Sequence, residues 1–120
     1  MNARAACLTV KPGSTSTRML RQDLRAAAEA FVTWLRSNGV RVTVTSTFRS
    51  QDTQRALYEN YQRGCSRYPA APPGRSAHGE GRAFDLHLDP PVYSQAGAVW
   101  ESIGGTWGGR FNDPIHFEVR

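Results

Sequence analysis

Apolar residues recur at helical spacing in the first third of the chain. They place one stripe on a single helix face, formed by Leu20, Leu24, Ala28, Phe31 and Leu35. This pattern predicts a helix over about residues 19–37, which Asn38 and Gly39 end because glycine tolerates the left-handed cap position. From Val40 onward, valines alternate with polar residues, and this period of two predicts a half-buried strand.

A second helix is predicted over about residues 51–63. Ser50 suits its N-cap, and Asp52 lies in the first turn, where a negative charge is favourable. Gly64 is expected to end this helix. Its core-facing residues are expected to be Ala56, Leu57 and Tyr61.

The rest of the chain predicts shorter elements joined by irregular segments. Residues 64–77 are rich in Pro and Gly and predict a long loop, and a loop of this length in a small domain usually has a function. A strand is predicted over residues 81–88, a short helix over about 94–102, and a last strand near 115–119.

The alternation of helices and strands predicts a small single α+β domain, with a mostly antiparallel sheet flanked by helices. A length of 120 residues fits one compact domain and leaves no room for a second. Pro12, Gly13 and the polar run after them are poor helix formers. We therefore expect an N-terminal arm over residues 1–19 and the folded domain over 20–120.

Charge and hydropathy narrow the classes of partner. The net charge is +5 and almost all basic residues are Arg, which favours anionic partners. The Arg residues are scattered, so no specific nucleic-acid site is expected, and a polyanion-binding protein is an alternative that rests on charge alone. No stretch approaches the roughly 20 apolar residues that span a bilayer. The apolar run at the N-terminus is too short for a signal peptide, so we expect a chain made without an export signal or shown without it.

The two cysteines leave two alternatives open. Cys7 and Cys65 are far apart and form no C-x-x-C pair, so their spacing does not indicate a metal site. They could bridge the N-terminal arm to the central loop, or both could be free.

The candidate chemistry lies in two segments. His78 and Asp85 share the segment SAHGEGRAFDLHL, and His116 lies in NDPIHFEV near the C-terminus. Two imidazoles and one carboxylate form a three-ligand set for Zn²⁺, which prefers four ligands, and an open fourth position distinguishes a catalytic site from a structural one. Asp113, three residues before His116, is then the candidate base.

The alternation of side chains along the predicted strand 81–88 places the candidate ligand Asp85 on the face opposite the apolar core. It directs Asp85 to the face opposite Phe84, Leu86 and Leu88, which predicts a zinc site in a cleft on the sheet. His87 shares the Asp85 face, but we expect it to lie at the surface or behind the ligands. Glu80 and Glu118 are interpreted as charged neighbours with no required role.

Three motifs, in order along the chain, resemble those of a known zinc peptidase family. Ser76 to Asp85 match S-x-H-x-x-G-x-A-x-D at every fixed position, Asp113 to His116 match an acidic residue followed after two others by His, and Arg49 lies in a Phe-Arg-Ser context with Gln54 shortly after it. The family includes VanY-like D-alanyl-D-alanine carboxypeptidases, D-Ala-D-Ala dipeptidases and phage L-alanyl-D-glutamate endolysins. The resemblance covers about residues 20–120.

The resemblance implies a role for each matched residue. Zn²⁺ is expected on His78, Asp85 and His116. Asp113 is expected to act as general base and Arg49 to stabilise the developing oxyanion. The side chains expected to contact the substrate or support the site are Ser76 and Gln54.

The resemblance also narrows the reaction. Many carboxypeptidase members have Glu where this chain has Asp113, so the chain looks like the endolysin branch. We therefore expect a monomeric, zinc-dependent L-Ala-D-Glu endopeptidase acting on the peptidoglycan stem peptide in the cell wall or periplasm, with phage- or holin-type release or virion association. The alternatives are a D-Ala-D-Ala carboxypeptidase and a non-catalytic zinc-stabilised binding module.

Overall fold

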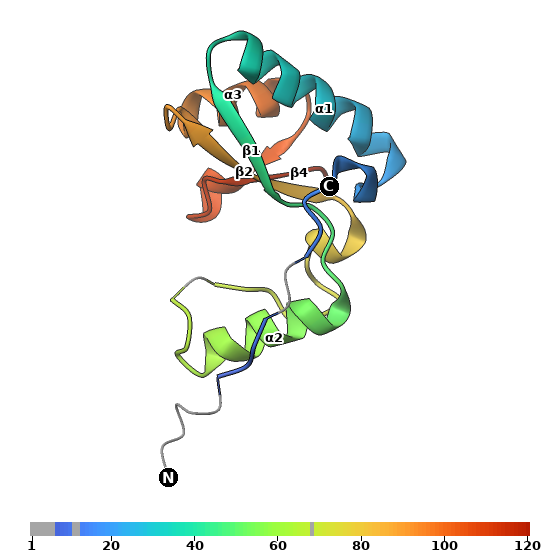
Figure 1. Cartoon of the computed structure of the whole chain (residues 1–120), viewed down its shortest axis with the longest axis vertical. Coiled ribbons are helices and arrows are strands. Elements are labelled where there is room, and N and C mark those ends of the chain that lie inside the picture. The colour runs from blue at the N-terminus through green and yellow to red at the C-terminus, as the bar shows by residue number, and fades with distance from the viewer. Residues whose placement is uncertain (1–6, 11–12, 68) are drawn as a thin grey trace.

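A four-stranded antiparallel sheet organises the fold (Figure 1). The computed structural model describes residues 7–10, 13–67 and 69–120. The strands lie in the order β1 (Arg41–Ser46), β2 (Ala83–Asp89), β4 (His116–Glu118) and β3 (Thr106–Trp107). The predicted α+β class with an antiparallel sheet is confirmed. Strand β3 was not predicted, because two residues are too few to show an alternating pattern.

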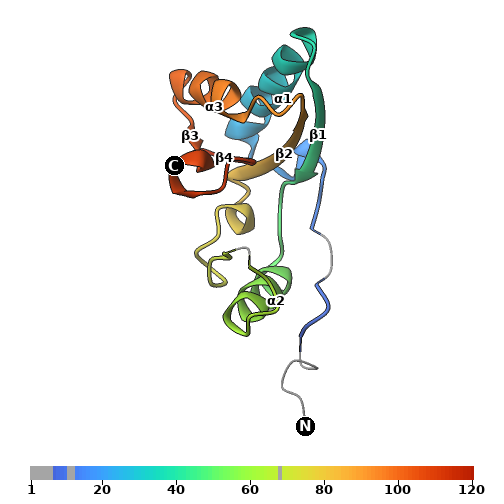
Figure 2. The ribbon, with the colours of Figure 1, turned by 90° about the vertical axis from the view of Figure 1, so that its left-hand side faces the viewer.

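Two helices cover one face of the sheet (Figures 1 and 2). Helix α1 (Gln22–Ser37) begins after Leu20 and buries the other four residues of the predicted stripe, while Leu20 is buried just before the helix. Helix α3 (Tyr93–Ser102) adds Ala96 and Trp100. The sheet contributes chiefly Phe84, Leu86, Leu88 and Phe117 to the same core. Packing of this kind leaves the opposite face of β2 and β4 free for polar side chains. In the part of the chain that the structure describes, no helix is long and apolar enough to cross a membrane.

Helix α2 (Gln51–Gln62) lies apart from this core, below the polar face of the sheet (Figures 1 and 2). The prediction that Ala56, Leu57 and Tyr61 face the core is wrong, because none of the three is buried and Tyr61 is 40% exposed. The buried residues of α2 are instead Thr53, Gln54 and Asn60.

Polar contacts hold α2 to the irregular segments around it. Gln54 Nε2 donates a hydrogen bond to the Ala71 carbonyl at 2.7 Å. The Asn60 side chain bonds both backbone groups of Leu8, accepting from N–H at 2.7 Å and donating to the carbonyl at 2.8 Å. A helix that satisfies neighbouring backbone groups must bury polar residues, so an apolar stripe does not identify its buried face. We call α2 and residues 64–67 and 69–77 the lower lobe.

The N-terminal segment is tied to both parts of the molecule. Ser14 pairs with the chain after β1, donating from N–H to the Phe48 carbonyl at 3.0 Å and accepting from Thr47 N–H at 2.7 Å. A disulfide joins Cys7 to Cys65, so the bridged alternative is the one that the structure contains. The boundary between an arm at 1–19 and a domain at 20–120 stays a prediction.

Replacing both cysteines by serine is expected to lower the free energy of unfolding by about 2–4 kcal/mol. The bridge spans 58 residues, and cross-linking distant residues restricts the unfolded chain. Urea denaturation of the oxidised wild type and the double variant measures the difference. A reducing agent should lower the midpoint of the wild type alone. Equal midpoints for the oxidised wild type and the variant would contradict the expectation.

Candidate metal centre

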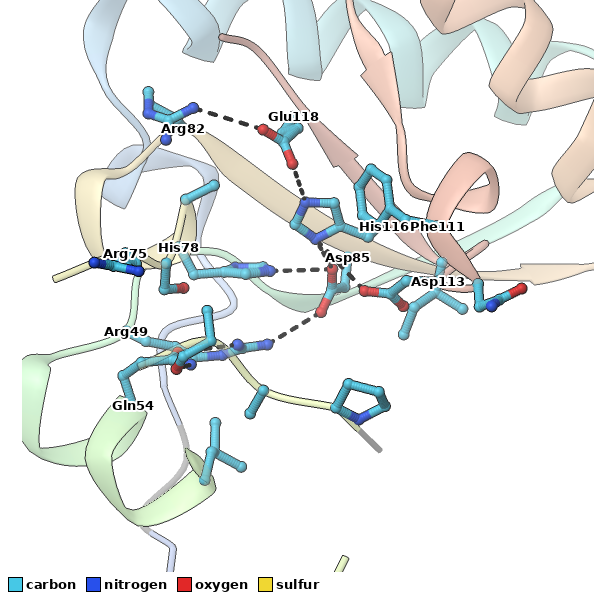
Figure 3. Close-up of a pocket in the computed structure, with 18 of the residues that line it drawn as sticks. Arg49, Gln54, Arg75, His78, Arg82, Asp85, Phe111, Asp113, His116 and Glu118 are labelled. Atoms are coloured by element: carbon cyan, nitrogen blue, oxygen red, sulfur yellow. Dashed lines mark hydrogen bonds and ion pairs between the residues drawn. The ribbon is translucent and has the colours of Figure 1, made fainter. Parts of the chain in front are cut away.

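Three buried polar side chains converge on the polar face of the sheet (Figure 3). Asp85 on β2 and His116 on β4 are directly paired in the antiparallel register, so their side chains leave the sheet side by side. His78 lies in the 3₁₀ turn His78–Glu80, just before β2. The turn ends at Gly81 with φ of 69°, a left-handed conformation that glycine adopts easily, and the chain then enters β2.

The donor atoms of these side chains are spaced as ligands of one ion would be. Asp85 Oδ1 lies 3.1 Å from His78 Nε2 and 3.2 Å from His116 Nδ1. One donor atom from each residue falls within 4.8 Å of the others. Ligands about 2.1 Å from a tetrahedral zinc ion lie roughly 3.4 Å from one another. The set therefore fits Zn²⁺.

Each imidazole is oriented by a hydrogen bond from its other nitrogen. The Thr47 carbonyl, which can only accept, lies 2.6 Å from His78 Nδ1, so Nδ1 donates to it and Nε2 is the ring nitrogen that faces Asp85. His116 Nε2 lies 2.9 Å from Glu118 Oε1 and donates to it, which leaves Nδ1 for the ion. Acceptors of this kind fix the tautomer of metal-binding histidines.

Thr47 and Glu118 were missed as supports of the site. The interpretation of Glu118 as a neighbour without a role does not agree with its contact to His116. Glu118 follows His116 by two residues on one strand, so the period of two places both on the same face. That spacing was a signal available in the sequence. The carbonyl of Thr47 had none, because any residue supplies a backbone oxygen.

Charge in the cluster is balanced by the neighbouring residues. Burial alone would raise the pKa of Asp85, but hydrogen bonds from His116 and His78 hold it well below its usual range. Burial alone would likewise lower the pKa of His116, but the Asp85 and Glu118 carboxylates raise it to about 9. Without a metal, His116 is therefore protonated on both ring nitrogens and positively charged at neutral pH.

Zinc binding is expected to release about one proton at neutral pH. The His116 Nδ1 that faces Asp85 must lose its proton before it can bind a metal, and the pKa near 9 keeps it protonated below that pH. Apparent zinc affinity should therefore rise about tenfold per unit between about pH 6 and 8 and level off above the pKa. Titration against a competing chelator, with calorimetry in two buffers of different ionisation enthalpy, measures both effects. An affinity independent of pH would contradict the assignment.

Asp113 lies at the edge of the cluster, where it remains accessible. Its Oδ2 is 3.9 Å from His116 Nδ1, and its side chain is 48% exposed. Partial burial, helped by the Asp85 charge, raises the pKa of Asp113, which brings a carboxylate closer to the range of an effective base. Gly108 makes this position possible, because a Cβ there would come within 2.2 Å of the Asp113 carbonyl oxygen.

Arg49 lies on the other side of Asp85. Its Nη2 donates to Asp85 Oδ2 at 3.2 Å, and Nη1 donates to Gln54 Oε1 at 3.3 Å. Gln54 is held in turn by the Ala71 carbonyl. Ser76 is buried beside the same space. The structure thus brings together every residue that the motifs predicted.

A cleft of about 1000 Å³ separates the polar face of the sheet from the lower lobe. The sheet wall supplies Asp85, His116 and Glu118, and residues 111–113 form one edge. The opposite wall includes Leu57 of α2 and residues 69–71 of the long loop. Residues of the segment 64–77 thus line the cleft, and the expectation that this segment has a function stays a prediction.

Comparison with known proteins identifies the family. The family model for VanY, D-alanyl-D-alanine carboxypeptidase, matches residues 17–102. The chain belongs to the VanY family. The match includes Arg49, His78 and Asp85 and ends before Asp113 and His116, so the last two rest on the motif and the geometry described above. No curated protein sequence matches this VanY-family chain.

Solved structures share the fold at low sequence identity. VanY from the VanB-type resistance cassette, solved in complex with Zn(II), is 18% identical with a TM-score of 0.69, over 96% of this chain and 80% of that one. The Serratia marcescens L-Ala D-Glu endopeptidase ChiX is 22% identical with a TM-score of 0.64, over 97% and 92%. The LdcB LD-carboxypeptidase is 16% identical with a TM-score of 0.65, over 83% of this chain and 58% of that one. The VanY-family chain therefore spans little more than half of LdcB.

The family model confirms the predicted peptidase family, and the solved structures confirm the α+β fold. Zinc as the cofactor agrees with the Zn(II) complex of VanY and with the His-Asp-His cluster in this VanY-family chain. The individual assignments of His78, Asp85 and His116 as ligands, Asp113 as base and Arg49 as electrostatic partner stay predictions.

Proposed function

We propose that this chain is a zinc-dependent endopeptidase that hydrolyses the L-Ala–D-Glu bond of peptidoglycan stem peptides. The observation that supports a hydrolase most directly is the position of Asp113. Its half-exposed carboxylate adjoins the three-donor cluster at the cleft, where a proton acceptor is needed. His78, Asp85 and His116 are the proposed ligands.

The mechanism assigns one task to each side chain. A bound zinc ion supplies Lewis-acid chemistry and lowers the pKa of the attacking water. Asp113 accepts the proton of that water and delivers it to the leaving amine. Arg49 presents a fixed positive charge to the carbonyl oxygen as negative charge develops there, an effect commonly worth about 3 kcal/mol for one donor. Gln54 keeps the guanidinium in place.

Two features favour cleavage within a chain over removal of a terminal residue. Asp113 is one methylene shorter than Glu, as in the endolysin branch that the sequence resembles. The cleft of about 1000 Å³ lies at the upper end of the usual range for ligand sites, which suits a peptide that extends on both sides of the scissile bond. A D-Ala-D-Ala carboxypeptidase is the second candidate, and the description of the matching family model favours it.

A non-catalytic zinc-stabilised module would need neither Asp113 nor Arg49 in this arrangement. Arg49 bonds both Asp85 and Gln54, with its side chain 20% exposed, so its positive charge is fixed at the cleft beside the proposed metal donors. The joint placement of a base and a guanidinium beside the donors therefore supports turnover.

Mass spectrometry of fragments from a defined muropeptide tests the proposal. The zinc-loaded protein should release L-Ala-terminated and D-Glu-initiated fragments, and a chelator should stop their release. Release of a terminal D-Ala alone would favour the carboxypeptidase. No new fragments, from protein with zinc bound, would refute a peptidase acting on this substrate.

A further inference from the structure

Positive charge lines the cleft at four places. The described part of its wall contains four guanidinium groups, and they belong to Arg49, Arg75, Arg82 and Arg120. Basic residues that face a substrate cleft attract anionic groups, and the charge of a residue without an acidic partner in the protein is not already neutralised. The contacts that each of the four guanidinium groups makes within the protein therefore indicate which of them is available to a substrate.

Three of the four are already paired within the protein. Arg49 contacts Asp85 at 3.2 Å. Arg82 and Arg120 both contact Glu118, at 3.6 Å and 3.4 Å. Arg82 also pairs with a further carboxylate and donates to a backbone carbonyl. These three groups neutralise the acids that surround the metal cluster.

Arg75 differs from them. Among the described residues, no carboxylate or carbonyl contacts its guanidinium, although the residue lines the cleft (Figure 3). Its backbone is fixed by a turn, in which Arg75 N–H donates to the Pro72 carbonyl at 3.1 Å and Gly74 adopts φ of 84°. Only two residues separate Arg75 from His78. Arg75 is thus an exposed residue whose backbone is fixed by a turn shortly before the proposed ligand His78.

The substrate offers a matching group. In the stem peptide, D-Glu continues the chain through its γ-carboxyl, so its α-carboxylate stays free. A terminal D-Ala also has a free α-carboxylate. For both candidate bonds, L-Ala–D-Glu and D-Ala–D-Ala, the residue that supplies the leaving amine therefore bears an anion next to the scissile bond. Guanidinium and carboxylate form a charge-assisted, potentially bidentate pair.

We propose that Arg75 is a specificity-determining residue that binds the free α-carboxylate of the residue on the amine side of the scissile bond. This inference rests on the proposed peptidase function and adds the group by which the substrate is selected. It predicts that the enzyme distinguishes a carboxylate from the uncharged carboxamide of the same shape, a difference that also occurs as D-Glu against D-isoglutamine.

The test compares matched peptides with the wild type and with Arg75→Gln. One pair is L-Ala-γ-D-Glu-L-Lys and its α-carboxamide, and the other is a D-Ala-D-Ala peptide and its C-terminal amide. Wild-type kcat/KM should be about tenfold higher for the carboxylate form of the pair that is cleaved, mainly through KM, since an exposed ion pair is worth little more. Arg75→Gln should lower kcat/KM for the carboxylate form about tenfold and so abolish this preference.

Arg41→Gln is the control, because it removes the same charge from a side chain that is 89% exposed on β1 and outside the cleft. It should keep the wild-type preference. Equal wild-type rates on both forms, or a preference that survives in Arg75→Gln, would overturn the inference. A loss of kcat/KM of equal size on the carboxylate and carboxamide forms in Arg75→Gln would also overturn it.

A binding measurement separates this inference from the proposed function. Calorimetry with the zinc-loaded Asp113→Asn protein compares affinity for the same peptides. If neither pair is hydrolysed by the wild type, the peptidase proposal fails, yet tighter binding of a carboxylate form that Arg75→Gln removes would still support the subsite. Equal affinity for both forms would overturn it.

Discussion

Replacing Asp113 by asparagine is expected to lower kcat for peptide hydrolysis by about a thousandfold while zinc remains bound. Asparagine keeps the shape of the side chain but cannot accept the proton, and general-base catalysis typically contributes 10²–10⁴-fold, roughly. The Asp113 side chain is 48% exposed, so its replacement disrupts no fully buried network. Single-turnover and steady-state rates on a defined muropeptide, with zinc content measured on the same sample, check the prediction.

Asp52→Asn provides the matched control, since its side chain is 92% exposed in the first turn of α2 and does not line the cleft. It makes the same chemical change and should leave the rate within twofold or so of the wild type. If zinc-loaded Asp113→Asn retained more than about a tenth of the wild-type kcat, another group would have to be the base.

The part of the fold that packs around the apolar core could be predicted from the sequence. In α1, the residues at helical spacing from Leu24 to Leu35 are all buried, as is Leu20 just before the helix. In β2, Phe84, Leu86 and Leu88 enter the core, while Asp85 turns to the other face and His87 is exposed. These elements follow pattern rules because the free energy that positions them comes from burying apolar surface on one side.

The lower lobe could not be predicted in this way. The buried residues of α2 are polar, and they bond backbone groups of segments far away in the sequence, such as Leu8 and Ala71. The carbonyl to which an Asn or Gln side chain donates a hydrogen bond depends on the tertiary arrangement, and such a contact produces no periodic pattern in the sequence. The same holds for the choice between free and bridged cysteines, which depended on the path of the N-terminal segment.

The candidate site likewise contains residues that could be predicted from the sequence and residues that could not. The three donors could be predicted because their chemistry restricts them to His, Asp and a few other residue types. The groups that orient the donors are less restricted. A backbone carbonyl orients His78, and Glu118 orients His116. One wall of the cleft is therefore positioned by the apolar core behind the sheet, and the other is positioned by polar contacts. Only the position of the first wall could be predicted from the pattern of apolar residues in the sequence.

Replacing His78 by glutamine is expected to reduce zinc affinity by more than about 100-fold and to remove measurable peptidase activity. Changes behind a metal ligand commonly cost 10–100-fold in affinity, roughly, so loss of a ligand itself should cost more. Glutamine is polar and can still donate a hydrogen bond to the Thr47 carbonyl, which limits the damage to the buried site. Competition with a chromogenic chelator measures the affinity.

Thermal unfolding with and without zinc distinguishes loss of the ion from loss of the fold. An ion that binds only the native state stabilises it by about 2.7 kcal/mol when its concentration is a hundredfold above Kd. Zinc should therefore raise the melting temperature of the wild type but not of His78→Gln. His87→Gln is the matched control, because His87 is exposed on the same strand as Asp85, outside the cleft lining. Zinc should stabilise this variant as it does the wild type. Equal stabilisation of His78→Gln would show that the ion lies elsewhere, since a cluster reduced to Asp85 and His116 provides too few ligands to hold zinc as tightly.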